Sequence, residues 1–261
     1  MSRPWESFYQ PLRTRTLFLT VFYGLTILSN LALIVVSARL YWWVSEMRSG
    51  VDVPLEPVRQ WESLEGVLGV GQLVLLLASV ITLLMWVYRS AHNAQALEQA
   101  KLAYSPGWCA GSFLIPILNL FRPYQALKQI MQYSTVSTVN PPHRDVSSLL
   151  GVWWFFVIAS SVVGRFAASV AQNADLLADL ENAYVAEIAR AVFHIGNCAF
   201  GLWLFWTIDR MQESKWAKVA DSDQRRACPS CGEAVDESEA ACPVCGTALS
   251  ASPEWQMPEF R

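Results

Sequence analysis

Four long apolar runs dominate the pattern of hydrophobic and polar positions along the chain. None of them contains Asp, Glu, Lys or Arg, and they occupy residues 17–37, 66–88, 146–164 and 191–208. Each is close to the roughly 20 residues that a helix needs to cross the hydrocarbon core of a bilayer. The pattern therefore predicts an all-α membrane protein, with four transmembrane helices at about 17–38, 66–88, 147–168 and 187–208.

The composition agrees with a chain whose surroundings are a lipid bilayer. Hydrophobic residues make up 53% and charged residues 16% of the chain, whereas soluble domains carry about 25% charged residues. Tryptophans near the ends of the runs are expected to form belts at the membrane surface; they are Trp42, Trp43, Trp86, Trp153, Trp154, Trp203 and Trp206. The formal net charge of −3 gives no basic field, so no nucleic acid is expected as a partner.

Lys and Arg are unevenly distributed among the segments that flank the apolar runs. They prevail before the first run, between the second and third, and after the fourth, whereas residues 173–187 hold acidic residues and no basic one. The positive-inside rule then predicts a multi-pass protein of the cell (inner) membrane with both termini cytoplasmic. We expect the first run to be an uncleaved span, because it is too long for the apolar core of a signal peptide.

The segment between the second and third runs predicts helices outside or at the edge of the membrane. The second helix is expected to continue to about residue 97, and Ser105–Trp108 then interrupts the helical pattern. Residues 108–121 are apolar but too short to span, and Pro116 lies within them, which indicates a re-entrant or interfacial segment. Pro116 and Asn119 fit either a broken helix that lines a transport site or, as we favour, a segment under the bundle. A helix is predicted from Arg122-Pro123 to about residue 133.

This middle segment also carries a resemblance to a known family. The matching residues are Tyr88-Arg89, Asn93-Ala94, Ala96-Leu97, Ser105-Pro-Gly-Trp108, Gly111, Ile115-Pro116, Asn119-Leu120 and Arg122-Pro-Tyr-Gln125. They resemble a bacterial multi-pass membrane family catalogued as domain of unknown function 4328, over about residues 17–211. The resemblance implies a multi-helix membrane module and no known activity, ligand or catalytic residue. Met131-Gln-Tyr133 departs from the Trp-bearing helix end that the family suggests.

A stripe of polar residues is predicted along one face of the fourth transmembrane helix. The stripe follows spacings of three and four residues and consists of Glu187, Arg190, His194, Asn197 and Gly201. Arg190 is expected to pair with Glu187 and, like Arg165 on the third helix, to extend toward the membrane surface.

His194 and Asn197 lie deeper and need partners on other helices, for which the candidates are Ser160, Ser161 and Gln72. We favour a hydrogen bond that stabilises the bundle over a proton or ion relay, and both interpretations stay open. A membrane protease or hydrolase is not indicated, because the spans contain no carboxylate pair. The glycines at 66, 69 and 71 are interpreted as a close helix-packing site, and Cys109 and Cys198 as small packing residues.

Two Cys-Pro-x-Cys-Gly pairs near the end of the sequence predict a metal site. Cys228 and Cys231 form the first pair, and Cys242 and Cys245 form the second. Each pair can turn two thiolates toward one tetrahedral ion, and four sulfur ligands leave no open position for water. In a reducing compartment such thiols bind metal rather than form disulfides. We predict a zinc ribbon at 226–249 with one structural zinc ion, with iron or a metal-free tail as alternatives.

The predicted organisation is a cytoplasmic N-terminus (1–15), a four-helix transmembrane domain (16–211), a linker (212–225), the zinc ribbon and a disordered tail (250–261). No catalytic constellation is evident. The sequence therefore favours a non-enzymatic regulatory or scaffolding membrane protein whose cytoplasmic ribbon binds a protein partner. The alternative is a small transporter or channel subunit. With four helices per chain, several copies would have to assemble into a homo-oligomer to form a pore.

Overall fold

The computed structural model describes residues 9–98, 101–135, 143–174, 176–223, 225–228, 230–236 and 239–249. The predicted tail 250–261 and the first eight residues of the predicted N-terminus lie outside the described residues. The chain divides into two compact units, Met1–Gln212 and Glu213–Arg261. Each unit is described by itself.

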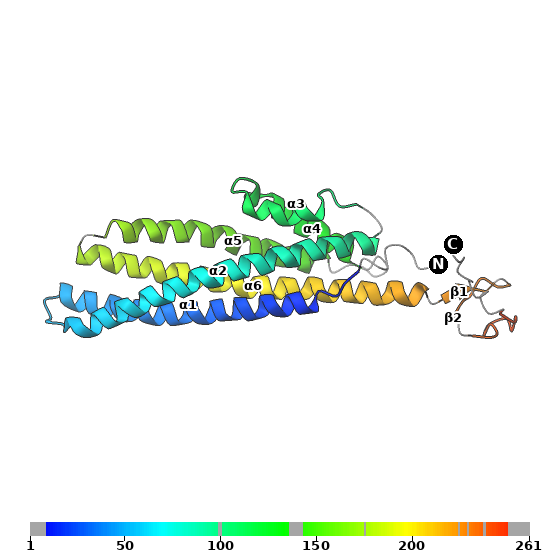
Figure 1. Ribbon diagram of the computed structural model, residues 1–261, viewed down its shortest axis with the longest axis horizontal. Helices are drawn as coiled ribbons and strands as arrows, with labels where there is room; N and C mark the ends of the chain where they lie inside the picture. The colour runs from blue at the N-terminus through cyan, green and yellow to red at the C-terminus, as the bar shows by residue number, and fades with distance from the viewer. Residues whose placement is uncertain are drawn as a thin grey trace, which may run out of the picture. The chain divides into compact units, whose positions relative to one another are not determined.

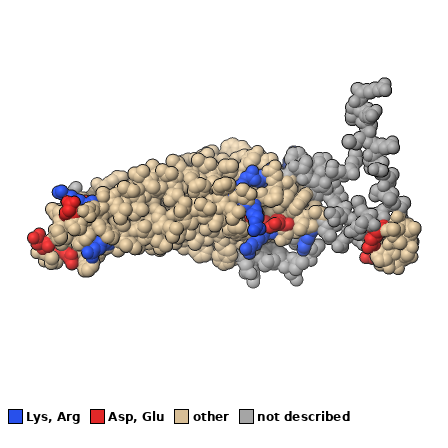
Figure 2. Space-filling model, turned by 60° about the horizontal axis from the view of Figure 1, so that its bottom comes forward, with Lys and Arg blue, Asp and Glu red and all other residues tan. Residues whose placement is uncertain are grey.

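Four long helices form the first unit, which confirms the predicted architecture. They are α1 (Arg13–Arg48), α2 (Leu55–Glu98), α5 (His143–Gln172) and α6 (Leu177–Asp223), and all four are long and apolar enough to cross a membrane. The four helices run side by side along the unit (Figure 1). On the face shown in Figure 2, the charged side chains of this unit gather toward its two ends, and a broad uncharged band separates them. The first unit is therefore that of a membrane protein.

The helices continue past the uncharged band at the end where α1 turns into α2. The turn uses Gly50, whose φ of +89° suits glycine. At this end, buried apolar side chains of α1, α2 and the connecting loop form a small separate core, namely Val36, Leu40, Val53 and Val58. At the same end Arg48 Nε lies 3.2 Å from Glu181 Oε1 of α6.

One aromatic residue from each long helix meets in the centre of the bundle. The ring of Phe205 on α6 lies 4.8 Å from Trp86, 5.4 Å from Trp153 and 6.0 Å from Tyr23, between centroids. Trp86 also donates through Nε1 to Thr16 Oγ1 at 3.0 Å. Both Trp86 and Trp153 are fully buried. The predicted placement of these two tryptophans in a surface belt is therefore wrong: they fill the core, while Trp42 and Trp203 are exposed.

Two glycines of α6 allow close contact with the facing helices. A Cβ at Gly196 would lie 2.3 Å from Phe156 Cε1 of α5, and one at Gly201 would lie 2.8 Å from Trp153 Nε1. By contrast, nothing lies within 4 Å of a Cβ built at the glycines at 66, 69 and 71 of α2. The prediction that these three α2 glycines form a helix-packing site is wrong within this chain, because the described residues place no other helix against them.

The segment between α2 and α5 folds back along the bundle as short helices. They are α3 (Pro106–Gly111), η2 (Ser112–Leu114), η3 (Leu118–Leu120) and α4 (Arg122–Ser134). Ser105 does not only interrupt the preceding helix: its hydroxyl accepts from the Trp108 backbone N–H at 3.4 Å and caps α3, with Pro106 in the first turn. The predicted helix that starts at Arg122-Pro123 is α4.

The second unit contains a short antiparallel hairpin, β1 (Arg225–Ala227) and β2 (Ala234–Asp236). Arg226 faces Val235 across this pair. A single bridge between Ala241 and Ala248 follows later in the chain. Both pairings enclose a turn that carries two of the cysteines.

Candidate functional site

The four paired cysteines of the second unit converge on one point. Their sulfurs all lie within 4.8 Å of one another. Cys228 Sγ lies 3.5 Å from Cys245 Sγ, and Cys231 Sγ lies 3.7 Å from Cys242 Sγ. In a tetrahedral site with metal–sulfur bonds of about 2.3 Å, sulfurs stand about 3.8 Å apart. None of the four forms a disulfide. The cluster therefore fits one tetrahedral metal ion.

The two cysteine turns have the same backbone geometry. The N–H of Cys228 donates to Glu233 O at 2.7 Å, and the N–H of Gly232 donates to Cys228 O at 2.9 Å. In the second turn, Cys242 donates to Thr247 O and Gly246 donates to Cys242 O, both at 2.9 Å. Gly232 and Gly246 have φ values of +77° and +71°, which favour glycine. Such repeated turns aim two sulfurs each at a shared centre.

Two thiols of the cluster, Cys245 and Cys231, have pKa values shifted in opposite directions. The hydroxyl of Thr247, whose Oγ1 lies 3.1 Å from Cys245 Sγ, lowers the pKa of Cys245 to about 6. At Cys231 the Glu233 backbone N–H lowers the pKa, but the neighbouring cysteine sulfurs and burial outweigh it and raise the pKa to about 12. Because metal ligands are thiolates, the lowered pKa of Cys245 favours the form that binds a metal.

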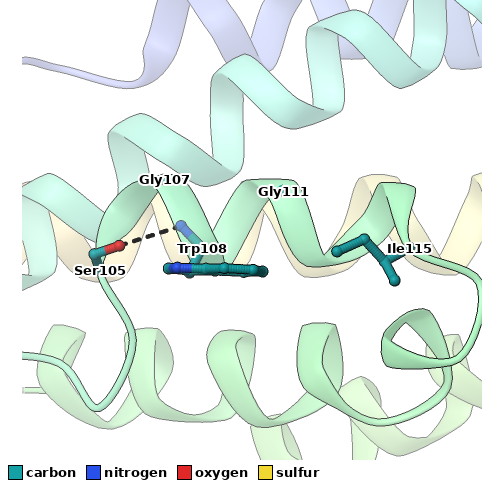
Figure 3. A pocket seen from close by; sticks show the side chains of 5 residues that line it. All are labelled: Ser105, Gly107, Trp108, Gly111 and Ile115. Atoms are coloured by element: carbon teal, nitrogen blue, oxygen red, sulfur yellow. Dashed lines mark hydrogen bonds between the residues drawn. The ribbon is translucent and has the colours of Figure 1, made fainter.

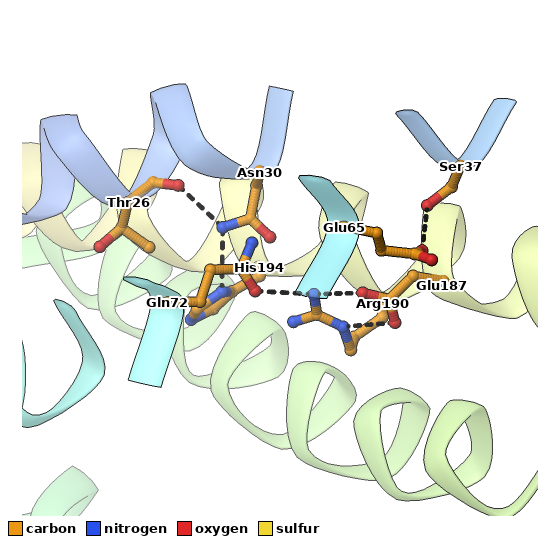
Figure 4. Close-up of polar contacts among 8 residues, drawn as sticks. All are labelled: Thr26, Asn30, Ser37, Glu65, Gln72, Glu187, Arg190 and His194. Carbon is orange, nitrogen blue, oxygen red and sulfur yellow. Dashed lines mark hydrogen bonds and ion pairs between the residues drawn. The ribbon is translucent and has the colours of Figure 1, made fainter. Parts of the chain in front are cut away.

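The first unit contains a chain of polar side chains within its apolar bundle (Figure 4). Arg190 of α6 binds Glu187 through two contacts, Nε to Oε2 at 2.8 Å and Nη2 to Oε1 at 2.6 Å. Its Nη2 also donates to Gln72 Oε1 of α2 at 2.9 Å. Arg190 and Glu187 thus pair as the sequence predicts. The hydrogen bond to Gln72 in addition connects α2 with α6.

His194 lies one turn along α6 from Arg190, and its partner is on α1. Asn30 Nδ2 lies 3.3 Å from His194 Nδ1 and also donates to Thr26 O at 2.8 Å. The sequence suggested Ser160, Ser161 or Gln72 as the partner of His194, and this expectation is wrong. Ser161 bonds to Val157 O of its own helix instead. The isolated Asn30 in the first apolar run was the available clue.

Several buried polar atoms of the helical bundle have no hydrogen-bond partner among the described residues. They include Asn30 Oδ1, Gln72 Nε2, Ser79 Oγ, Ser160 Oγ and Asn197 Oδ1. The sequence predicted that Asn197 needs a partner on another helix, and the described residues provide none for Oδ1. Arg165 is exposed on α5 and takes no part in the bonds described for the polar chain. The predicted polar group therefore divides: Arg190 and His194 connect helices, and Arg165 does not.

The residues that carry the family resemblance build a cap around the C-terminal end of α2. Asn93 receives the Gln10 N–H at Oδ1 (3.2 Å) and donates from Nδ2 to Gln10 O (2.8 Å). Arg122 lies over the Tyr104 ring at 4.6 Å, and the Tyr104 hydroxyl donates to Gln125 Oε1 at 2.9 Å.

α6 is also hydrogen-bonded to this cap. Gln212 Nε2 donates to the Ser90 backbone oxygen and hydroxyl, both at 3.0 Å, and to Ser134 Oγ at 3.1 Å. These bonds hold α2, α4 and α6 together. Among the motif residues, Asn93, Arg122 and Gln125 have structural contacts within this cap.

Together these features define a multi-helix integral membrane protein with a module of four cysteines whose geometry fits a metal ion. The sequence profile of the family described as domain of unknown function (DUF4328) matches residues 49–210, and the chain belongs to that family. This range holds α2, the cap segment, α5 and most of α6, and ends before the cysteine module. No curated protein and no solved structure gives a significant match to the chain.

Proposed function

We propose that the chain is a non-enzymatic regulatory or scaffolding protein of the cell inner membrane, with both termini in the cytoplasm. In this proposal the cysteine module holds one structural zinc ion and binds a protein partner. The observation that carries it is the closed four-sulfur cluster, which leaves no open coordination position for a substrate.

Zinc is the metal that suits the cluster best among those that a cell supplies. Tetrahedral four-sulfur sites are typical of structural zinc, and iron can use the same ligands. Purified protein should contain one zinc ion per chain by elemental analysis. Iron in its place, with the absorption of an iron–thiolate centre, would contradict this part of the proposal.

An exposed valine supports partner binding by the module. Val244 lies between the two cysteines of the second turn and is exposed. The corresponding position of the first turn, fourteen residues earlier, is Ser230. An apolar side chain presented on a rigid metal-held turn is suited to a small protein contact, because little conformational freedom is lost on binding.

The matched substitutions Val244→Asp and Ser230→Asp test this role. Crosslinking in intact membranes should capture a partner with wild type and with Ser230→Asp, but not with Val244→Asp or with Cys228→Ser/Cys231→Ser. All four proteins should remain in the membrane fraction. Capture that is unaffected by both Val244→Asp and the cysteine change would refute partner binding through the module.

The cytoplasmic location has a separate test. In intact, metal-depleted cells, a thiol reagent that cannot cross the membrane should leave Cys228 and Cys242 unmodified, and should modify them once the cells are opened. Modification in intact cells would place the module outside and reverse the proposed orientation.

A small transporter or channel subunit is the second candidate. Buried polar atoms of Asn30, Ser79, Ser160 and Asn197 have no hydrogen-bond partner in the part of the chain that the structure describes. This favours the candidate, because such atoms inside a bundle need water or an ion. Ion or proton flux into proteoliposomes, compared between wild type and His194→Leu, tests this candidate. Equal flux in both, at the level of empty vesicles, would exclude it.

A further inference from the structure

The part of the cap that holds α3, η2 and η3, residues 106–121, exposes an apolar surface. This surface belongs neither to the cysteine module nor to the polar group around Arg190 and His194. Residues 106–121 contain no charged residue. Their exposed large side chains are all apolar, namely Trp108, Leu114, Ile115, Ile117, Leu120 and Phe121. Ile117, at the turn between η2 and η3, is 77% exposed. Proteins in water rarely leave so continuous an apolar surface uncovered.

A shallow groove runs along the exposed side of α3 (Figure 3). It has a volume of about 390 Å³ and is lined by Ser105, Gly107, Trp108, Gly111 and Ile115. Nothing lies within 4 Å of a Cβ built at Gly107 or Gly111, so both glycines leave the groove open. Its walls are the Trp108 ring and the Ile115 side chain. The shape and the apolar walls suit a hydrocarbon chain.

The opposite side of the segment joins the core of the membrane bundle. Cys109 and Ala110 of α3 are buried in the same cluster as Trp86 and Val87 of α2. Figure 1 shows α3 and α4 alongside α2 and α5 rather than beyond their ends. The neighbouring part of α2 exposes Ile81 and Met85, which lie in its transmembrane run. The apolar surface of the segment thus continues the lipid-facing surface of the spanning helices.

The backbone of the segment is suited to a medium without water. The Cys109 N–H donates to Ser105 O at 2.9 Å, and the Asn119 N–H donates to Ile115 O at 2.7 Å. The Phe121 backbone N–H donates to Leu118 O at 3.1 Å. Pro116, at the break between η2 and η3, has no N–H to satisfy. Irregular backbone is tolerated at membrane depth where protein covers it, and the Cys109–Ala110 side of the segment packs on the core of the bundle.

The flanking residues are polar. Lys101 precedes the segment, and α4 exposes Arg122, Gln125, Lys128 and Gln132, which share one face at spacings of three and four. Long basic side chains reach lipid headgroups from a helix that lies at the membrane surface. The polar face of α4 therefore marks the headgroup level beside the apolar segment.

We propose that residues 106–121 insert into the acyl region of the leaflet nearest the C-terminal end of α2, and that the α3 groove holds a lipid acyl chain. In this placement residues 106–121 form a re-entrant segment, which enters one leaflet and leaves it on the same side. The chain then continues at the headgroups as α4. Among the described residues, the four long helices cross the bilayer and residues 106–121 do not. Arg122 and Tyr104, which flank the segment and contact each other, stay at the surface of the bilayer.

Photolabelling of the full chain in native membranes tests this placement. One phospholipid carries a diazirine deep in its acyl chain, and a second carries it in the headgroup. The acyl probe should label peptides of 106–121 and Val70 of α2, but not Val244 of the cysteine module. Val70 and Val244 are matched controls because they are 67% and 66% exposed.

Two outcomes would overturn the proposal. Labelling of 106–121 by the headgroup probe alone would place the segment on the membrane surface. No labelling by either probe, with Val70 labelled, would show that a protein covers it. In addition, Ile117→Asp should lower acyl labelling of the segment at least about fivefold, because a carboxylate is costly in hydrocarbon. Ser230→Asp, at an exposed position of the cysteine module, should leave it unchanged.

Discussion

Asn30 Nδ2 lies 3.3 Å from His194 Nδ1, and this contact joins the first and last long helices inside the apolar band. Asn30 is fully buried. Its Nδ2 also donates to Thr26 O at 2.8 Å, which sets the orientation of the side-chain amide. His194 Nδ1 must then accept, so the contact requires a neutral imidazole with its proton on Nε2. An additional proton on Nδ1 would place two donors against each other.

The Asn30–His194 contact should contribute measurably to the stability of the bundle. In a double-mutant cycle of Asn30→Ala and His194→Ala, we expect a coupling free energy of about 0.6–1.7 kcal/mol, as for hydrogen bonds between membrane helices. Reversible unfolding by denaturing detergent in bicelles measures it. The matched cycle of His194→Ala with Ser161→Ala should give no coupling, because Ser161 bonds within α5. Equal values in both cycles would contradict the assigned contact.

The spans could be predicted from the sequence because a continuous apolar run fixes a membrane helix without reference to its neighbours. The cysteine cluster could also be predicted, since both turns are local and their glycines follow directly. The partner of His194 could not, because it depends on how α1 rotates against α6. The same limit explains Trp86 and Trp153: their positions near run ends fit a surface belt, but helix rotation turns them into the core.

Gly196 should be intolerant of a side chain. A Cβ there would lie 2.3 Å from Phe156 Cε1 and 2.5 Å from Phe156 Cδ1, so the ring or the helix must move. We expect Gly196→Ala to lower the free energy of unfolding by about 1–3 kcal/mol, the usual cost of overpacking. Thermal or detergent unfolding in bicelles measures the change.

Gly69→Ala is the control for Gly196→Ala, because nothing lies within 4 Å of its Cβ. It should leave the bundle unchanged or stabilise it by up to about 1 kcal/mol, since alanine favours helix over glycine. Phe156→Leu should recover part of the stability lost in Gly196→Ala. Equal destabilisation by both glycine substitutions, without recovery, would contradict the α5–α6 contact.

Asn93 should hold the residues ahead of α1 against the end of α2. Asn93→Ala removes both bonds to Gln10, and we expect a loss of about 1–3 kcal/mol from the cap. Asn93→Asp keeps the acceptor for the Gln10 N–H and loses only the donor to Gln10 O. Hydrogen exchange at the Gln10 amide should therefore increase strongly in the alanine variant and less in the aspartate variant. Asn173→Ala, which removes a bond to Ser169 O on α5, is the matched control and should not change it.

Removal of the metal should unfold the cysteine module and leave the helical unit intact. Among the described residues of the module, the buried apolar cluster consists of Cys228, Val235, Cys242 and Leu249, and a core of this size cannot offset the entropy of the chain without a metal. After chelation, the amides of Cys228 and Cys242 should lose protection from hydrogen exchange, because their bonds to Glu233 O and Thr247 O depend on the folded turns.

The helical unit has its own core and forms a separate compact unit. Protection along α1 and α2 should therefore be the same before and after chelation. Cys228→Ser should reproduce the loss of protection without a chelator, whereas Cys109→Ser, which changes a buried thiol of α3, should retain one metal ion per chain. Protected turns in metal-free protein would mean that the four cysteines do not depend on an ion. Loss of protection throughout α1 and α2 would mean instead that the two units unfold together.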